Sequence, residues 1–395
     1  MQIETRSYQF IIKFLILLIC VVVLTSCYEQ GETSTQLNDI SDLSFSDSFI
    51  SEQVENTSYE VEHSDVFCES SYNSQEVEES TQEQESFHGW IINEFGYTYV
   101  YNACGYEQFN YKATALNRYV NALNTFRAVL PNDIRLFNIT VPVSSTFAEI
   151  PREIYTNDNF YNQSQSAFVN TISAMTDEDI INVPIVDEME SCYDNGDYVY
   201  FRTDKNWTSL GAYNAYLKFC EQSGIVPHPL SNHKIIEIGN FLGSFYNATL
   251  LPEMSDFPDE FVCYSTLPTV NTTMTVYDNG IQYNNYSLCM NNVGERNAYD
   301  VYLGRSAERY EICTNSSGGA LLIISDSSAY PLIPFLASHF SKIDVIDPRK
   351  FTSDLSEYLS NHSYDDCIIV CYSTNAISGE FIPKLNIFTG EEINE

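Results

Sequence analysis

The sequence predicts an α/β domain built on a mostly parallel sheet. Its last third alternates apolar runs with helical segments: strands are expected at 320–324, 342–347 and 367–372, and helices at about 330–340 and 352–360. Strands that are apolar throughout and joined by helices are typical of a parallel sheet covered on both faces. A hydrophobic content of 44% is ample for such a core. We therefore expect one folded domain, residues 89–395, behind a different kind of N-terminal region.

Residues 1–27 have the pattern of a lipoprotein signal peptide. Arg6 and Lys13 supply positive charge, and the apolar run 14–24 is shorter than the ~20 residues of a membrane-spanning helix. The run ends in Leu-Thr-Ser-Cys, the pattern of a bacterial lipobox, so Cys27 is expected to carry lipid; an ordinary signal peptide or an uncleaved anchor is the alternative. A lipid on Cys27 predicts an extracytoplasmic protein anchored to the bacterial cell membrane.

Residues 28–88 form an acidic segment with 16 Asp or Glu and no Lys or Arg. The segment is rich in Ser, Gln, Thr and Asn, and it has few large apolar residues to offset the entropy of ordering. Like charges also extend such a chain. We expect a disordered tether that holds the domain away from the envelope; an acidic binding tail is the alternative.

Charge and cysteine spacing exclude several classes of function. A formal net charge of -36, with only 18 Lys and Arg, argues against nucleic-acid binding, which needs clustered basic residues. No metal site is predicted, because no CxxC pair is present, and no cofactor is predicted, because the phosphate-binding glycine motifs are missing. Apart from Cys20 in the leader and Cys27, nine cysteines remain, which predicts scattered buried thiols and at most one or two disulfides.

The front half of the domain shows alternating helical and extended patterns. A clear 3.6-residue period and Gly224 at its end predict the last of its helices. The elements expected here are a helix at 113–130, a strand at 133–142, a helix at 159–175, a strand at 182–186 and a helix at 209–222. Residues 230–315 are rich in Asn, Tyr and Thr without a helical period, so we expect an irregular insertion of short strands and loops packed on the core.

Two polar clusters stand where chemistry is expected. Asp326, Ser327 and Ser328 follow a buried strand and precede a helix. In parallel sheets, sites form at the carboxyl ends of strands, and a serine at a helix N-terminus has backbone N–H groups nearby that can hold an oxyanion. The alternative is a helix cap, since Ser and Asp are preferred capping residues. Arg349 and Asn375 follow neighbouring strands and are expected to line the same cleft, or else to be a surface charge and a turn residue.

The second cluster precedes the 209–222 helix and reads Asp204-Lys205-Asn206-Trp207-Thr208. Taken alone, it is better explained by a packed tryptophan and a capped helix start than by a functional site.

The segment "YFRTDKNWTSLGAYNAYLKFC" resembles the motif region of the DHHW proteins, an exported family similar to SGNH-type exopolysaccharide (alginate-type) O-acetyltransferases. "GIVPHPLS", "NFLGSFY" and "IISDSSAYPLIPFLASHFSKIDVIDPR" extend the resemblance over residues 90–380. It implies an SGNH-hydrolase-like three-layer fold, with Asp204 as the triad acid and Ser327 as the nucleophile. Asn206 stands where the catalytic histidine is expected, and Lys205 replaces the other histidine of the motif.

This departure divides the functional expectation. An Asn amide cannot take the serine proton as a neutral imidazole does, and Lys205 could do so only if burial lowered its pKa. His228 and His233 are the nearest substitutes in sequence, while His339 lies at the far end of the predicted helix. We expect lost or altered catalysis and binding of polysaccharide or an envelope protein; the alternatives are an active O-acetyltransferase or esterase with a non-standard base, or another activity on the same fold.

Overall fold

The computed structural model describes residues 87–388, apart from 292. These residues belong to one compact unit. The predicted signal peptide, Cys27 and nearly all of the acidic segment therefore lie outside the described residues. No helix in the described part is long and apolar enough to cross a membrane.

An eight-stranded sheet forms the centre of the domain, with strand order β5-β4-β13-β11-β12-β10-β8-β9. The sheet is mixed, because its two halves run differently. The strands from β5 to β12 are each parallel to their neighbours, whereas β10, β8 and β9 are added antiparallel. The strands are β4 (Arg135–Val141), β5 (Ile180–Asn182), β8 (Thr272–Asp278), β9 (Ile281–Tyr286), β10 (Arg309–Thr314), β11 (Gly318–Ser325), β12 (Phe340–Ile346) and β13 (Asp366–Tyr372).

The expectation of a mostly parallel sheet with an irregular insertion needs correction on this point. Part of the segment 230–315 folds as β8, β9 and β10 and extends the main sheet. These strands alternate: Met274 and Val276 are buried, and Thr273 is exposed. An alternating pattern fits an antiparallel edge and carries a weaker signal than a continuous apolar run.

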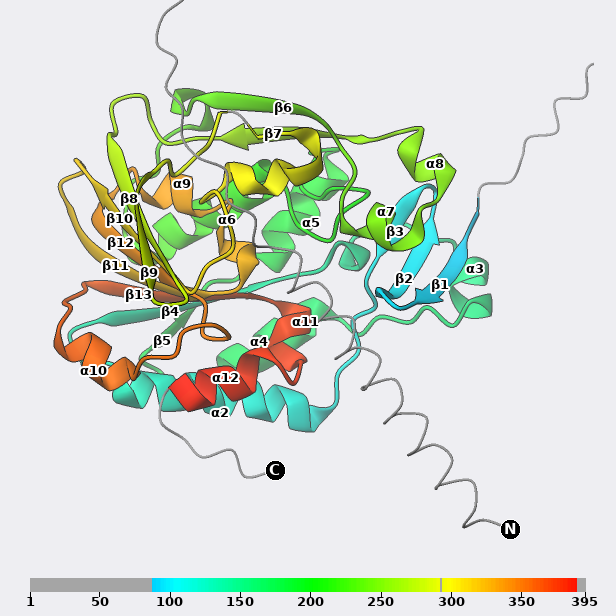
Figure 1. The fold of residues 1–395 in the computed structure, drawn as a ribbon. Coiled ribbons are helices and arrows are strands. Elements are labelled where there is room, and N and C mark those ends of the chain that lie inside the picture. Colours follow the sequence, from blue (N-terminus) through cyan, green and yellow to red (C-terminus); the bar gives the residue numbers. More distant parts are fainter. Residues whose placement is uncertain (1–86, 292, 389–395) are drawn as a thin grey trace, which may run out of the picture. The chain divides into compact units, whose positions relative to one another are not determined.

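Helices lie on both faces of the sheet (Figure 1). On one face, α2 contacts α11 and α12; on the other, α6 contacts α9. The bounds are α2 (Ala113–Val129), α4 (Gln165–Met175), α5 (Val186–Asp194), α6 (Ser209–Ser223), α9 (Ile333–Leu336), α10 (Leu355–Ser360), α11 (Ser373–Ile377) and α12 (Phe381–Phe388).

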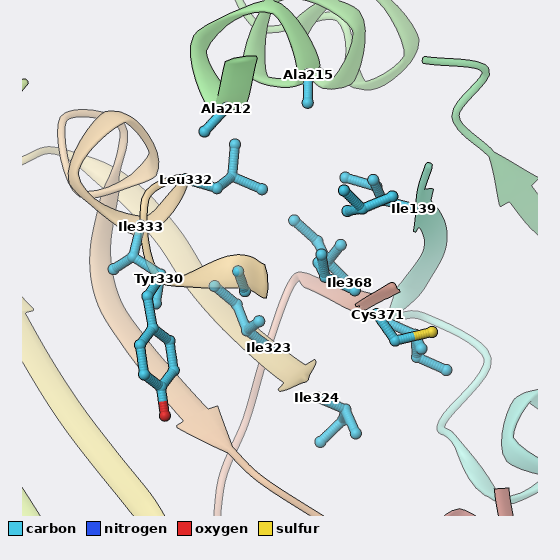
Figure 2. Close-up of a cluster of buried hydrophobic side chains, with 14 of the residues drawn as sticks. Ile139, Ala212, Ala215, Ile323, Ile324, Tyr330, Leu332, Ile333, Ile368 and Cys371 are labelled. Atoms are coloured by element: carbon cyan, nitrogen blue, oxygen red, sulfur yellow. The ribbon is translucent and has the colours of Figure 1, made fainter. Parts of the chain in front are cut away.

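Helix α6 covers the sheet closely because its inner face is small. Figure 2 shows Ala212 and Ala215 directed at Ile139, Ile323 and Ile368 of the sheet, and all five side chains are fully buried. The ends of α6 are defined by local chemistry: the Thr208 hydroxyl accepts a hydrogen bond from the Gly211 amide, and Gly224 closes the helix at a φ of 78°. The predicted helix 209–222 is thereby confirmed.

Two smaller sheets complete the fold. The first joins β1 (Gly89–Asn93), β2 (Gly96–Tyr101) and β3 (Cys104–Tyr106), and the second pairs β6 (Ile235–Phe241) with β7 (Asp259–Tyr264). The short helices α3 (Arg152–Asn157), α7 (Ser244–Thr249) and α8 (Pro252–Ser255) lie beside them in the chain order.

Three predicted elements differ from the structure. The helix expected at 159–175 begins at Gln165, where the Ser164 side chain caps it, and the strand expected at 182–186 is β5, ending at Asn182. The helix expected at 330–340 is reduced to the 3-10 turn η4 (Ser327–Ala329) and α9. Pro334 explains this: it has no N–H to donate inside a long helix, but it fits the first turn of α9, where no donor is needed.

Within the described part of the chain, every cysteine is a free thiol, so the one or two disulfides allowed by the sequence are not formed there. Most of these cysteines are buried, as the pattern of scattered thiols predicted: Cys192, Cys220, Cys263, Cys367 and Cys371.

Candidate functional site

Ser327 sits at the carboxyl end of the central strand β11, as the sequence predicted. β11 ends at Ser325, and the Asp326 carboxylate then accepts a hydrogen bond from the Ser328 amide at 2.8 Å, which bends the chain into η4. Asp326 and Ser328 are buried, whereas Ser327 is partly exposed. Of these three residues, only Ser327 is therefore accessible to solvent. The helix-cap alternative applies to Asp326, whose side chain caps η4.

Asp326 also ties this turn to the neighbouring strand. Its second oxygen accepts hydrogen bonds from the Tyr372 amide at 3.2 Å and from the Asn375 side chain at 2.5 Å. Asn375 thus lies beside the turn formed by residues 326–328, the serine turn, at the position that the sequence indicated. The carboxylate is 1% exposed, so these donors stabilise a buried charge that would otherwise be costly. Asp326 acts as a structural anchor for the turn.

Arg349 forms its ion pair with a different carboxylate, that of Asp347. Its guanidinium donates to both oxygens of Asp347, at 2.9 and 2.8 Å. These hydrogen bonds, with the charges of Asp347 and Asp326, raise the pKa of Arg349 above its usual value. Arg349 therefore lies within electrostatic reach of the serine turn, but its donors are occupied by Asp347.

The motif loop, residues 204–208, and the neighbouring Ser244 surround the Asp204 carboxylate with hydrogen-bond donors. One carboxylate oxygen accepts from the Asn206 amide at 2.8 Å and from the Asn206 side chain, and the other accepts from the Ser244 amide at 2.6 Å. Gly243 makes this close approach possible, since a Cβ there would lie 2.2 Å from the Asp204 Cβ. Asp204 is 4% exposed and oriented toward Asn206, as an aspartate is oriented toward the histidine of a catalytic triad.

Asn206, which the resemblance places where the catalytic histidine is expected, carries an amide that cannot act as a base. Its side-chain nitrogen donates to Asp204, and its oxygen accepts a hydrogen bond from the Tyr372 hydroxyl at 2.9 Å. Both ends of the amide are thus satisfied within a buried site. Burial, together with nearby Tyr299 and Asp326, raises the pKa of Tyr372 well above its usual value, so the phenol stays protonated and is itself no base.

Trp207 joins the two clusters that the sequence singled out. Its indole N–H donates to the Ser328 carbonyl at 2.9 Å, and its side chain is fully buried. The motif loop and the serine turn are therefore in direct contact, although Trp207 and Ser327 are 120 residues apart in the sequence. The packing explanation of this tryptophan is correct, and the packing is what places Asp204 and Ser327 at one site.

Lys205 lies at the rim of the site. Its side chain is exposed, and its backbone amide donates to the Ser244 hydroxyl at 3.2 Å. A lysine base would have to be buried to lose its proton near neutral pH. The condition that the sequence set for a Lys205 base is therefore not met.

The described histidines lie elsewhere. His228 stacks on His339 with ring centroids 4.6 Å apart, and His339 precedes β12 at the edge where β11 begins. Ser327 follows the opposite end of β11, about 23 Å away at ~3.3 Å per residue. His233 hydrogen-bonds the Ser265 carbonyl and packs on Phe335. His88 pairs with Asp158, and His362 with the Tyr358 carbonyl. Among the described residues, none supplies the missing imidazole.

Three side chains at the site were not singled out by the sequence. The Tyr299 hydroxyl donates to the Ser327 carbonyl at 3.4 Å, and Tyr372 bonds Asn206. Burial raises the pKa of the Glu107 carboxyl, Lys205 opposes this rise, and the charges of Asp204 and Asp326 add to it. Only Tyr372 carried a usable signal, its place at the end of a predicted strand.

The structure thus defines an α/β domain in which a serine turn at the end of a central strand is bound, through a buried tryptophan, to the loop that holds Asp204. The DHHW protein family model matches residues 35–346, and the chain belongs to this family.

Two solved structures show the same fold, and a third is less similar. A DHHW family protein from Eubacterium siraeum superposes with a TM-score of 0.65 at 23% identity, covering 78% of this chain and 98% of its own. Bacillus cereus PatB1 with a sulfonyl adduct gives 0.58 at 15% identity, with 75% and 99% covered. The O-acetyltransferase domain of Pseudomonas putida AlgJ gives 0.40 at 15% identity, with 76% and 99% covered. No curated protein matches the chain.

Proposed function

We propose that this chain is an extracytoplasmic lipoprotein, anchored through Cys27, whose SGNH-like domain binds an envelope glycan without carrying out serine–histidine catalysis. One observation carries the proposal: Asn206, at the place of the base, is fixed between Asp204 and Tyr372. The cleft keeps the orientation of a triad and lacks its proton acceptor.

The chemistry of acyl transfer explains why this exchange matters. The serine hydroxyl must lose its proton as it attacks the acyl carbon, and the same base must return the proton to the leaving group. An amide nitrogen does neither at any useful pH. Removing a member of such a triad lowers turnover by several orders of magnitude, although donors around the oxyanion can leave a residual rate.

The glycan part of the proposal rests on resemblance. The motif region is similar to that of exopolysaccharide O-acetyltransferases, and AlgJ, one of the structural neighbours, is described as an O-acetyltransferase. The extracytoplasmic location rests on the lipobox ending in Cys27.

The proposal is tested with p-nitrophenyl acetate and three proteins: the parent, Ser327→Ala and Asn206→His. We expect the parent and Ser327→Ala to be equally inactive, and Asn206→His to gain a rate that a further Ser327→Ala change abolishes. Labelling with a sulfonyl fluoride, read by intact mass, gives a second readout of serine reactivity that needs no turnover. A parent that hydrolyses the ester through Ser327 would overturn the loss of catalysis.

The second candidate function is an active esterase or O-acetyltransferase with a carboxylate base. The Glu107 carboxyl favours it, because its pKa is raised and it lies near Asp204 and Asp326. In that case the Ser327-dependent rate of the parent would disappear in Glu107→Gln, a change that removes the proton acceptor and keeps the shape of the side chain.

A further inference from the structure

A cavity of about 440 Å³ lies between the β1–β2 hairpin and α11, and the proposed function assigns it no role. It is lined by Trp90, Ile92, Tyr97, Glu107, Gln108 and Thr374. These residues come from the β1–β2 hairpin, from the segment just after β3, and from α11. A pocket of several hundred Å³ with mostly apolar walls and a few polar groups is the usual form of a small-molecule site.

The cavity adjoins the serine turn through two of its walls. Thr374 precedes Asn375, whose side chain donates to Asp326 at 2.5 Å. Glu107 is close enough to Asp204, Lys205 and Asp326 for their charges to act on its carboxyl. Through Thr374 the cavity thus reaches the segment that is hydrogen-bonded to Asp326, the residue before Ser327.

The aromatic wall is rigid at its base and open at its tip. Trp90 donates its indole N–H to the Asp158 carbonyl at 2.9 Å and packs edge-on against Tyr99 and Phe160. Two residues along the strand, Ile92 pairs directly with Tyr97, so their side chains share the face of Trp90. Ile92 is 63% exposed and Tyr97 is 72% exposed. A monomeric domain gains nothing in stability from keeping such side chains in water.

The lining residues match one class of ligand. Aromatic rings pack on the apolar C–H face of a pyranose, whereas a carboxylate and an amide bond its hydroxyl groups. Glu107 and Gln108 supply these polar groups at one side of the cavity, and Trp90 and Tyr97 supply the rings. The backbone beneath them is fixed, since the Ser145 hydroxyl donates to the Glu107 carbonyl at 2.6 Å.

The negative charge of the domain narrows the class of sugar further. Residues 89–395 carry 37 Asp and Glu against 16 Lys and Arg. Beside the cavity, the charges of Asp204 and Asp326 act on Glu107 together with that of one exposed cation, Lys205. A carboxylated sugar would meet repulsion from these groups, whereas a hydroxyl or an ammonium group would be a donor to Glu107.

We propose that this cavity is a sugar-binding subsite next to Ser327, and that it takes a neutral or amino-sugar unit of a glycan rather than a uronate. The inference rests on the proposed function and specifies its ligand. Tyr97 and Trp90 stack on the sugar ring, and Glu107 accepts from its hydroxyl or ammonium group.

Isothermal titration of the purified protein with three oligomers tests the subsite: glucosamine, neutral β-glucan and galacturonate oligomers. We expect one of the first two to bind best. Tyr97→Ala and Glu107→Gln should each weaken that binding at least tenfold, and Ile92→Ser should weaken it less. Phe95→Ala is the matched control, because Phe95 is 70% exposed on the same hairpin and does not line the cavity; it should change binding less than twofold.

Preference for the galacturonate oligomer, binding that survives Tyr97→Ala and Glu107→Gln, or no binding of any oligomer would each overturn the subsite. The two proposals fail separately. Ester hydrolysis that depends on Ser327 contradicts only the loss of catalysis, because the subsite is judged by oligomer binding and not by the ester. Oligomer binding is measured without turnover and judges only the subsite. Thermal melts of all variants show that each is folded.

Discussion

Replacing Trp207 by Phe is the sharpest test of how the site is held together. The indole is fully buried, and its N–H donates to the Ser328 carbonyl at 2.9 Å. Phenylalanine keeps an aromatic ring there but cannot donate, so the Ser328 carbonyl loses its partner inside the protein. Leaving a buried acceptor unpaired costs about 1–3 kcal/mol.

The lost ring adds to this cost. Phenylalanine is smaller than tryptophan by part of a ring, equivalent to two or three buried methylene groups at about 0.8 kcal/mol each. The two effects together predict that Trp207→Phe lowers the free energy of unfolding by about 3–5 kcal/mol, a large share of the ~5–15 kcal/mol typical of folded domains. Urea denaturation followed by circular dichroism measures it as a fall of the midpoint at an unchanged slope.

Trp90→Phe is the matched control, since the other tryptophan also donates to a carbonyl at 2.9 Å, that of Asp158, but is only partly buried. Water can replace the lost donor there, and we expect a cost of about 1 kcal/mol. If Trp207→Phe costs no more than this control, the contact between the motif loop and the serine turn is not what stabilises the site, and the argument above is refuted.

Three further predictions concern other parts of the chain. Gly243→Ala places a Cβ 2.2 Å from the Asp204 Cβ and should displace Asp204 from the Ser244 amide, lowering stability by about 1–3 kcal/mol in urea denaturation; Gly294→Ala, where a Cβ meets nothing within 4 Å, should cost far less. Burial, with His228 and His233 nearby, lowers the pKa of His339 to about 4, so its contribution to stability is present above about 6.5, the usual histidine value, and is lost as pH falls toward 4. His339→Gln, which keeps an acceptor for the Tyr216 hydroxyl, should flatten the fall in unfolding midpoint between pH 6.5 and 4, and an unchanged slope would contradict this assignment. Cys27→Ala should move the protein from the detergent phase to the aqueous phase in a partition assay, whereas partition that is the same in both would argue against the lipid anchor.

The elements that the sequence predicted well are those whose signal is local. β11 and β13 are continuous apolar runs, and both are buried strands as expected. Helix α6 begins at a threonine cap and ends at Gly224, and both bounds agree with the prediction to within a residue. The β8–β9 hairpin did have a local signal, the two-residue turn Asn279-Gly280, which the prediction for residues 230–315 did not use. That this hairpin joins the main sheet through β10 could not be predicted, because β10 pairs with strands distant in the sequence.

The residues of the candidate site also differ in whether a local sequence signal revealed them. Asp204 and Ser327 were singled out because their segments resemble the DHHW motif regions, and the structure brings these segments together through Trp207. Tyr299 and Glu107 come from unrelated segments and carry no pattern of their own. Their relevance arises only from contact with Ser327 and from the shared charges of Asp204 and Asp326.

Asn206 shows why the cleft can keep its shape without the base. An imidazole at this place would donate to Asp204 with one nitrogen and offer the other to the serine. The Asn206 amide repeats the first contact and accepts from the Tyr372 hydroxyl, so two buried polar groups stay satisfied after the exchange. Asn206→Ala would leave the Tyr372 hydroxyl without this acceptor and Asp204 with only the amides of residue 206 and Ser244 as donors. Asn206→His would restore a side-chain donor to Asp204, but the Tyr372 hydroxyl would need another acceptor. Under the proposed function, an asparagine at this place therefore keeps the hydrogen-bonded arrangement of Asp204 and Tyr372 and removes only the proton acceptor.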